Sequence, residues 1–233
     1  DCSSVIEGVH RMMSDMWEIQ KKKKPRGLLE LKQNYGNIIS GQYGTMIRAG
    51  DTAYDMDTNL LRCFFIQAYA KITHNDYLAC SIHDTPETIG IMMIKMITAG
   101  VPTFSIDLVK QPPQTLAVIK AWLDFYRRRL DSWLVPREPL NIKMDVWRMG
   151  RSGEPVISAI LGANEITLPQ QKKVLVLNGT GRKEFFIRLS RPTALKVSLF
   201  NHRLEPAGSR KCRLSDGDML EIPSGGMAEI IRK

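Results

Sequence analysis

Strand-like and helix-like segments alternate over the first 130 residues, with short connections between them. Apolar spacing predicts helices over residues 5–23, 58–72, 86–97 and 113–130, and strands over residues 28–33, 43–47, 78–82 and 101–106. Such alternation is typical of a parallel sheet, either open or closed into a barrel. A closed barrel of this kind needs eight strands, so we expect the C-terminal half of a (β/α)8 barrel, with the other half lying upstream.

The pattern changes near residues 131–140, where Pro136 and Pro139 indicate a linker. Short β-branched segments separated by turns follow, with turn signals such as Asn178-Gly179. We interpret residues 138–233 as an antiparallel β-sandwich domain and residues 1–137 as the half-barrel domain.

The formal net charge of +9 raises the question of an anionic partner. Two basic runs stand out, at residues 21–24 and 127–129. Both fall at the expected C-terminal ends of helices, where cations meet the negative end of the helix dipole. No interleaved aromatic residues accompany them, so we expect solvated helix ends and no nucleic-acid partner.

Other features narrow the class of protein. No apolar stretch reaches 18 residues, so we expect no membrane span. We see no signal peptide at Asp1 and no initial Met, and expect a fragment or a processed piece. The cysteines are spaced for neither zinc nor a disulfide scaffold, which favours free thiols in the cytoplasm. We expect no cofactor. The cysteines are Cys2, Cys63, Cys80 and Cys212.

Polar side chains gather where the expected strands end, which is the place of the site in parallel α/β folds. The densest group surrounds Asp51, which follows Arg48 and Gly50. Asp55 and Asp57 are close by, and both could cap the next helix. The spacing is not that of a calcium loop, so we expect no metal. Asp51 precedes the cap and is the best catalytic candidate. The other polar strand ends are Gln33, Asn34, His83 and Asp107.

A second group follows the first expected strand. Two-residue alternation places Glu30, Lys32 and Asn34 on one face. Such a face suits recognition of a hydroxyl-rich ligand. The alternative interpretation is that these polar residues only form a turn at the end of the strand.

These residues resemble the family 36 α-galactosidases (glycoside hydrolases). The resemblance rests on Glu30-Leu31-Lys32-Gln33-Asn34-Tyr35, on Tyr43-Gly44-Thr45-Met46-Ile47-Arg48-Ala49-Gly50-Asp51, and on Asp55, Asn59 and Arg62. It implies a (β/α)8 barrel with a C-terminal β-sandwich and hydrolysis of terminal α-galactosides with retention. The strands of this chain would then be the fifth to eighth of the barrel.

The resemblance also implies roles for individual residues. Asp51 matches the general acid/base, with Asp55 as the fallback because residues 52–54 differ from the family's turn. Arg48 matches an arginine that lines the sugar subsite. The strand that lines the same pocket matches Lys32, Gln33 and Asn34, with Lys32 in place of the usual Arg.

The family nucleophile, an Asp on the fourth strand in a K-x-D context, has no counterpart here, and Asp1 is not assigned that role. We therefore expect this chain to be inactive alone, with the missing N-terminal half or a homo-oligomer as partner and an oligosaccharide or α-galactoside as substrate. A working acid needs a raised pKa, so we expect Arg48 to point to sugar hydroxyls or Asp55 and not to Asp51. The alternative is a non-catalytic barrel fragment that packs on a partner or binds carbohydrate, which an exposed apolar surface along residues 1–30 would favour.

Overall fold

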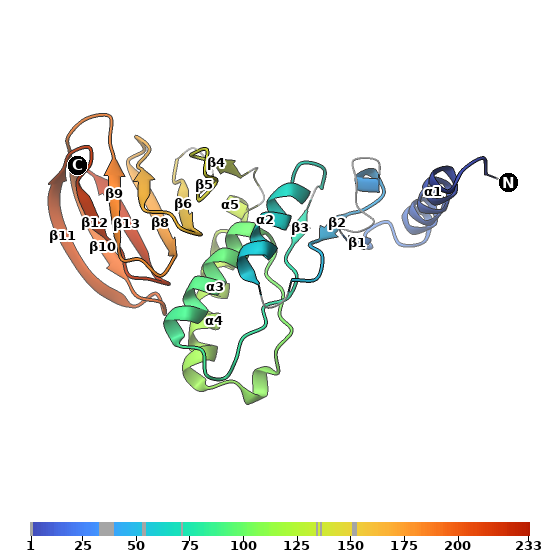
Figure 1. Ribbon diagram of the computed structural model, residues 1–233, viewed down its shortest axis with the longest axis horizontal. Helices are drawn as coiled ribbons and strands as arrows, with labels where there is room; N and C mark the ends of the chain where they lie inside the picture. Colours follow the sequence, from blue (N-terminus) through green and yellow to red (C-terminus); the bar gives the residue numbers. More distant parts are fainter. Residues whose placement is uncertain are drawn as a thin grey trace. The chain divides into compact units, whose positions relative to one another are not determined.

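The computed structural model describes residues 2–32, 40–52, 55–70, 72–133, 135, 137–150 and 153–233. They form a mixed α/β chain with several sheets (Figure 1). The chain divides into two compact units, Asp1–Leu78 with Ala99–Phe104 and Ala79–Thr98 with Ser105–Lys233. The second unit joins residues 79–98 and the segment from residue 105 to 137 to the sheets that follow residue 137. The predicted domain boundary between residues 137 and 138 therefore stays a prediction.

The first unit is built on a short parallel sheet with the strand order β1-β2-β3. Parallel pairing continues beyond β3 through two single bridges, His74 with Val101 and Leu78 with Phe104. The parallel sheet expected from the sequence is therefore present. The elements of this unit are α1 (Val5–Lys23), β1 (Glu30–Lys32), η2 (Ser40–Gln42), β2 (Met46–Arg48), α2 (Met56–Ile66) and β3 (Thr73–His74).

Helix α1 spans the predicted range, and Ser4 caps it by accepting a hydrogen bond from the Glu7 backbone N–H. Among the residues of α1 only Met13 is buried. The Tyr43 hydroxyl lies 2.7 Å from His10 Nδ1 and ties α1 to the segment before β2. The apolar stripe of α1 is exposed, as the alternative of a packing module requires; its members are Val5, Val9, Met12, Met16 and Ile19.

The prediction for the next helix and strand was wrong in position. Helix α2 ends at Ile66 and not at residue 72, and the third strand is β3, not residues 78–82. The helical spacing of apolar residues continues through Ile72, but the helix ends at Ile66 and Gln67 is its C-cap. The Gln67 Nε2 donates to the Ala99 carbonyl at 3.0 Å. The expected strand over residues 101–106 is reduced to the bridges at Val101 and Phe104.

The second unit contains two sheets that share one hydrophobic core. The larger has the order β11-β10-β13-β8-β6-β5-β4 and the smaller has the order β12-β9-β7. Most pairs are antiparallel, as predicted, but β6 pairs with β8 and β7 pairs with β9 in parallel. The strands are β4 (Glu138–Pro139), β5 (Val146–Met149), β6 (Val156–Ile160), β7 (Glu165–Thr167), β8 (Lys173–Gly179), β9 (Glu184–Arg188), β10 (Thr193–Phe200), β11 (Pro206–Leu214), β12 (Met219–Glu221) and β13 (Met227–Arg232).

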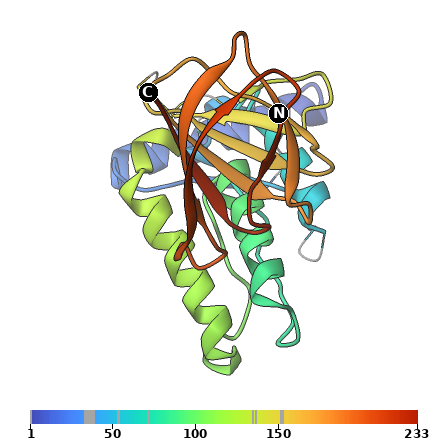
Figure 2. The ribbon, with the colours of Figure 1, turned by 90° about the vertical axis from the view of Figure 1, so that its left-hand side faces the viewer.

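Helices α3 (Pro86–Ala99) and α4 (Pro113–Arg128) begin at the predicted residues and run beside the sheets of this unit (Figure 2). Gly90 of α3 lies so close to a turn that a Cβ there would be 2.5 Å from the Gly225 carbonyl oxygen. Trp122 of α4 donates from its indole nitrogen to the His202 carbonyl at 3.0 Å. The β10–β11 and β12–β13 turns thus contact the two helices. The short helices η3 (Leu108–Lys110) and α5 (Leu130–Trp133) complete the unit.

Candidate active site

The parallel sheet of the first unit brings three basic side chains into one row. Lys32 of β1 is in register with Arg48 of β2, and Arg48 is in register with His74 of β3. Residues in register on neighbouring strands face the same side of a sheet. The row lies at the carboxyl ends of the strands, where the sequence predicted the site.

Arg48 is the centre of this row, with its side chain 11% exposed. Its Nη1 lies 2.5 Å from Asp76 Oδ1 and 3.5 Å from Asp51 Oδ1, and its Nε lies 3.4 Å from Glu30 Oε1. The guanidinium also stacks on Tyr77, 5.1 Å from the ring centroid. Burial acts to lower the pKa of Arg48, but Tyr77 and the carboxylates outweigh burial and raise the pKa. Arg48 is therefore a fixed cation shared among three acids.

Asp51 follows β2 and points outward, with its side chain 73% exposed. Lys32 Nζ donates to its Oδ2 at 2.6 Å, while Arg48 makes only the single 3.5 Å contact. The pKa of Asp51 is lowered, chiefly by the Lys32 hydrogen bond. Arg48 thus makes no bidentate pair with Asp51, but the pKa shift is opposite in direction to the expected rise.

Asp55 has a structural role. It is the N-cap of α2, and its Oδ1 accepts from the backbone N–H groups of Asp57 at 3.1 Å and Thr58 at 2.9 Å. The Thr58 hydroxyl donates to Oδ2 at 2.6 Å. The expected capping role is confirmed, and the suggestion that Arg48 points to Asp55 is replaced by its pairing with Asp76.

The residues at the end of β3 were not predicted from the sequence. His74 Nε2 lies 2.8 Å from Glu30 Oε2, and Asp76, 2% exposed, accepts from Arg48 and from the Thr52 backbone N–H at 2.5 Å. The available signal was the polar run 73–76 after Ile72. It was overlooked because the expected helix ended at residue 72 and the next expected strand began at residue 78, which left the run as a connection.

Two predicted polar strand ends lie elsewhere. Asp84 and His83 stand in a turn before α3, where Asp84 Oδ2 accepts from the Ser81 backbone N–H at 2.7 Å. Asp107 caps η3 by accepting from the Val109 backbone N–H at 3.1 Å. Two further site candidates, Gln33 and Asn34, lie outside the described residues.

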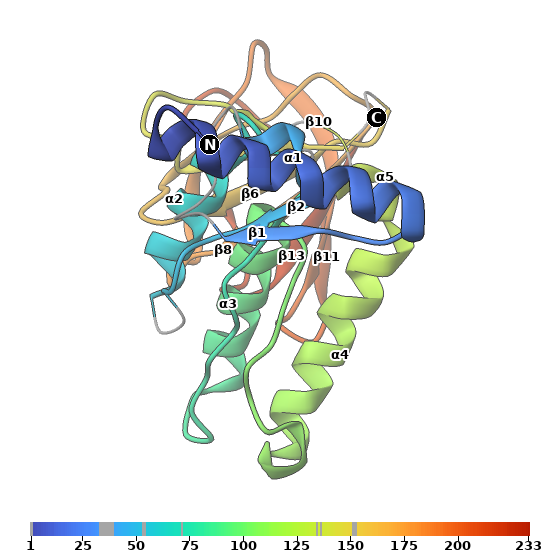
Figure 3. The same ribbon diagram turned by 90° about the vertical axis from the view of Figure 1, so that its right-hand side faces the viewer.

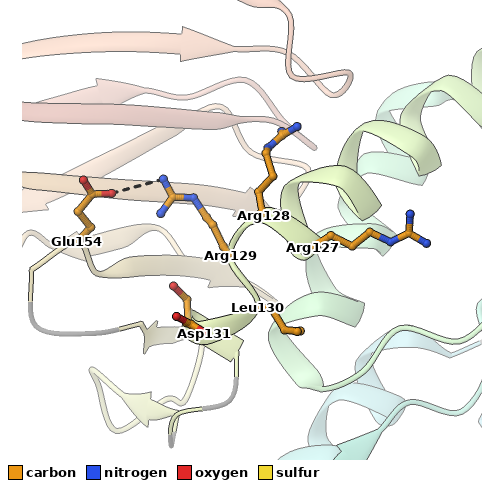
Figure 4. A pocket seen from close by; sticks show the side chains of 7 residues that line it. Arg127, Arg128, Arg129, Leu130, Asp131 and Glu154 are labelled. Atoms are coloured by element: carbon orange, nitrogen blue, oxygen red, sulfur yellow. Dashed lines mark ion pairs between the residues drawn. The ribbon is translucent and has the colours of Figure 1, made fainter.

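The basic runs are helix ends. Residues 21–23 form the last turn of α1, and Arg127 and Arg128 that of α4. Figure 4 shows Arg127, Arg128 and Arg129 pointing in three directions around a pocket of about 350 Å³, with Arg129 Nη2 3.5 Å from Glu154 Oε2. Because they diverge, they do not gather on one ligand position.

Two kinds of feature are absent from the described ranges. No group of three or more His, Cys, Asp or Glu side chains there could hold a metal ion. Each helix in those ranges also falls short of the length and apolarity that crossing a membrane requires.

Comparisons with known proteins bear on the fold. No protein-family model matches the chain, and no curated protein sequence matches it. Among solved structures, the chain is similar to α-galactosidase I from Mortierella vinacea, with a TM-score of 0.58 at 10% sequence identity. The similarity covers 96% of this chain and 62% of that one. The chain therefore shares the fold of part of a glycosidase and spans less than two thirds of its length.

Proposed function

We propose that this chain is the C-terminal half of a retaining glycoside hydrolase that acts on terminal α-galactosides. In this proposal residues 1–137 contribute half of a (β/α)8 barrel and residues 138–233 contribute a β-sandwich. One observation carries the proposal: Asp51 is an exposed carboxylate directly after parallel strand β2, flanked by Lys32 and Arg48. The family resemblance assigns the general acid/base to this position, and the fold of the Mortierella enzyme supports it.

The proposed mechanism gives each of the predicted site residues a task. Asp51 protonates the leaving oxygen and then takes a proton from water, while a second carboxylate about 5–5.5 Å away attacks the sugar. Arg48, Lys32, Gln33 and Asn34 bind sugar hydroxyls. The lowered pKa of Asp51 belongs to the chain without that second carboxylate. A neighbouring negative charge and loss of solvent both raise a carboxyl pKa, so completing the site would reverse the shift.

The nucleophile then comes from another segment, and the edge of β1 is the proposed place for it. Among the described residues β1 pairs with β2 alone. Helix α1 lies along β1 (Figure 3), and together they line an apolar pocket of about 410 Å³. A parallel strand beside β1, with its helix on α1, would cover this surface. The pocket includes Val9, Met12, Met13, Met16, Leu29, Leu31 and Tyr43.

The same exposed surface favours a second candidate function, a non-catalytic subunit that packs on a partner or binds carbohydrate. A second copy of the chain is a further candidate for the partner. We propose the cytoplasm as the compartment, because the four cysteines, all within the described residues, form no disulfide.

The test is reconstitution with the polypeptide encoded directly upstream of Asp1, which the proposal expects to contain a strand ending in K-x-D. The chain alone should not hydrolyse a nitrophenyl α-galactoside, and the combined halves should. Asp51→Asn should lower the rate of the combined halves about 10²–10⁴-fold, whereas Asp55→Asn should retain most activity. Hydrolysis by the isolated chain contradicts the proposal, and a stable but inactive complex supports the non-catalytic subunit.

A further inference from the structure

Both carboxylate oxygens of Asp76 accept hydrogen bonds. Arg48 Nη1 donates to Oδ1 and the Thr52 backbone N–H donates to Oδ2, each at 2.5 Å. The side chain is 2% exposed. One buried carboxylate therefore joins strand β2 to the loop that carries Asp51.

Asp76 is itself held in place by α2. Asn59, 1% exposed, donates from Nδ2 to the Asp76 carbonyl at 2.9 Å and accepts from the Asp76 backbone N–H at 3.2 Å. A side-chain amide that bonds both backbone groups of one residue resists its displacement in either direction. The Asp76 carboxylate thus has a defined position from which to act on its neighbours.

The contacts of Asp76 decide how Arg48 and Asp51 lie relative to each other. Arg48 Nη1 is 2.5 Å from Asp76 but 3.5 Å from Asp51, so the nearer carboxylate keeps the guanidinium from closing on Asp51. Thr52 follows Asp51, so its hydrogen bond to Asp76 fixes the adjoining peptide. The other cations that face Asp51 are Lys32, at 2.6 Å, and Arg62, which donates to the Asp51 carbonyl at 3.3 Å.

We propose that Asp76 is a positioning residue that draws Arg48 away from Asp51 and fixes the Asp51–Thr52 peptide, so that the Asp51 carboxylate stays open to a ligand. A carboxylate in a bidentate pair with an arginine would have to break two charge-assisted hydrogen bonds before it could exchange a proton. The need for an accessible Asp51 carboxylate rests on the proposed function. The positioning itself rests only on the contacts within the first unit.

The first test is Asp76→Asn in the full chain. The amide keeps the size of the side chain and an oxygen for Thr52, but it removes the charge that holds Arg48. Arg48 should then close on Asp51, and the acid dissociation constant of Asp51, followed by carboxyl-carbon NMR, should rise about threefold or more. Asp15→Asn removes an exposed carboxylate from α1 and should leave that constant unchanged. An unchanged Asp51 titration in folded Asp76→Asn overturns the proposal.

A second comparison separates the proposed route through Arg48 from the loss of a nearby negative charge. In an Arg48→Met background, Asp76→Asn should no longer change the dissociation constant of Asp51, because the cation that moves is absent. The same change in both backgrounds would mean direct repulsion between the two carboxylates, and it would overturn the proposal.

A third measurement needs no substitution at a buried site. Hydrogen exchange of the Thr52 amide in the unaltered protein should be slowed about tenfold or more relative to an unstructured chain. An unprotected Thr52 amide would contradict the positioning role. None of these measurements depends on hydrolysis. If they succeed and the combined halves are inactive, the proposed function fails and the positioning role stands.

Discussion

Lys32 sets the charge state of Asp51 more than any other residue does. Its ammonium group donates to Asp51 at 2.6 Å, and this hydrogen bond is the largest influence on the lowered pKa of Asp51. A lowered carboxyl pKa means that the ionised form is favoured in the folded chain. This stabilises the folded state at pH values above the pKa of Asp51 in the unfolded chain. The stabilisation is lost as the pH falls through the lowered pKa of the folded chain.

Replacing Lys32 should therefore raise the pKa of Asp51. In Lys32→Met the strongest donor is gone and the 3.5 Å contact with Arg48 remains, so the pKa should return toward its ordinary value. Carboxyl-carbon NMR over the acidic range measures this directly. Lys110→Met, which removes an exposed lysine paired with Asp107, serves as the control. A pKa that stays as low without Lys32 would mean that Arg48 alone is responsible.

At the scale of elements, Gly8 and Gly90 each lie within a helix but have different surroundings. A Cβ on Gly8 of α1 would meet nothing closer than Cys2 at 3.9 Å, but one on Gly90 of α3 would lie 2.5 Å from the Gly225 carbonyl oxygen and 2.9 Å from His202 Cβ. The first distance is an ordinary contact. The two distances from Gly90 are too short for a contact, so the β10–β11 and β12–β13 turns would have to move.

Alanine at these two positions should act in opposite directions. Gly8→Ala removes a poor helix former and should stabilise the chain by about 0.5–1 kcal/mol. Gly90→Ala gains the same propensity but forces the turns apart, and should destabilise by about 1–3 kcal/mol. Urea denaturation of both variants beside the unaltered protein gives the two signs. Equal stabilisation in both would show that the turns give way freely.

The elements that sequence predicted best are those with a long periodic pattern. Helix α1 has the predicted bounds, and α4 starts where predicted and ends within two residues of the prediction, because many apolar positions specify the period of each. Strand β3 has only two residues, Thr73 and His74, too few to show alternation. Its place is fixed by pairing with β2, a contact that no local pattern reveals.

The candidate site divides in the same way. Lys32, Arg48 and Asp51 could be predicted because their strands are marked by apolar residues and followed by polar ones. Asp76 could not, because its importance comes from a hydrogen bond to Arg48, 28 positions earlier in the chain. The pKa direction of Asp51 also escaped prediction, since it depends on the position of the Lys32 ammonium.

For the molecule as a whole, we expect the exposed face of α1 to govern association. Met12 and Met16 are about half exposed and line the apolar pocket beside β1. Buried apolar area drives association, so this face should make the chain self-associate at high concentration. The double variant Met12→Gln with Met16→Gln should reduce self-association in sedimentation velocity and change unfolding free energy by no more than about 0.5 kcal/mol per site.

A matched substitution checks that the effect belongs to the exposed face. Leu108 and Val109 are exposed apolar residues of η3 in the second unit. Changing both to Gln should leave the sedimentation behaviour as it is. Equal loss of self-association in both double variants would mean that general surface polarity, and not the α1 face, is responsible.

One edge of β1 pairs with no strand of the described residues, and this bears on how much of the protein a cell would accumulate. In the proposed assembly, a partner that covers β1 and α1 would bind the folded chain and not the unfolded one, so mass action would link the folded fraction to the partner's concentration. At a hundredfold excess over its Kd, such a partner adds about 2.7 kcal/mol of stability. Proteases act on unfolded chains, so chain made in excess of its partner is the first to be degraded. Abundance would then follow the supply of the partner more closely than the rate of synthesis.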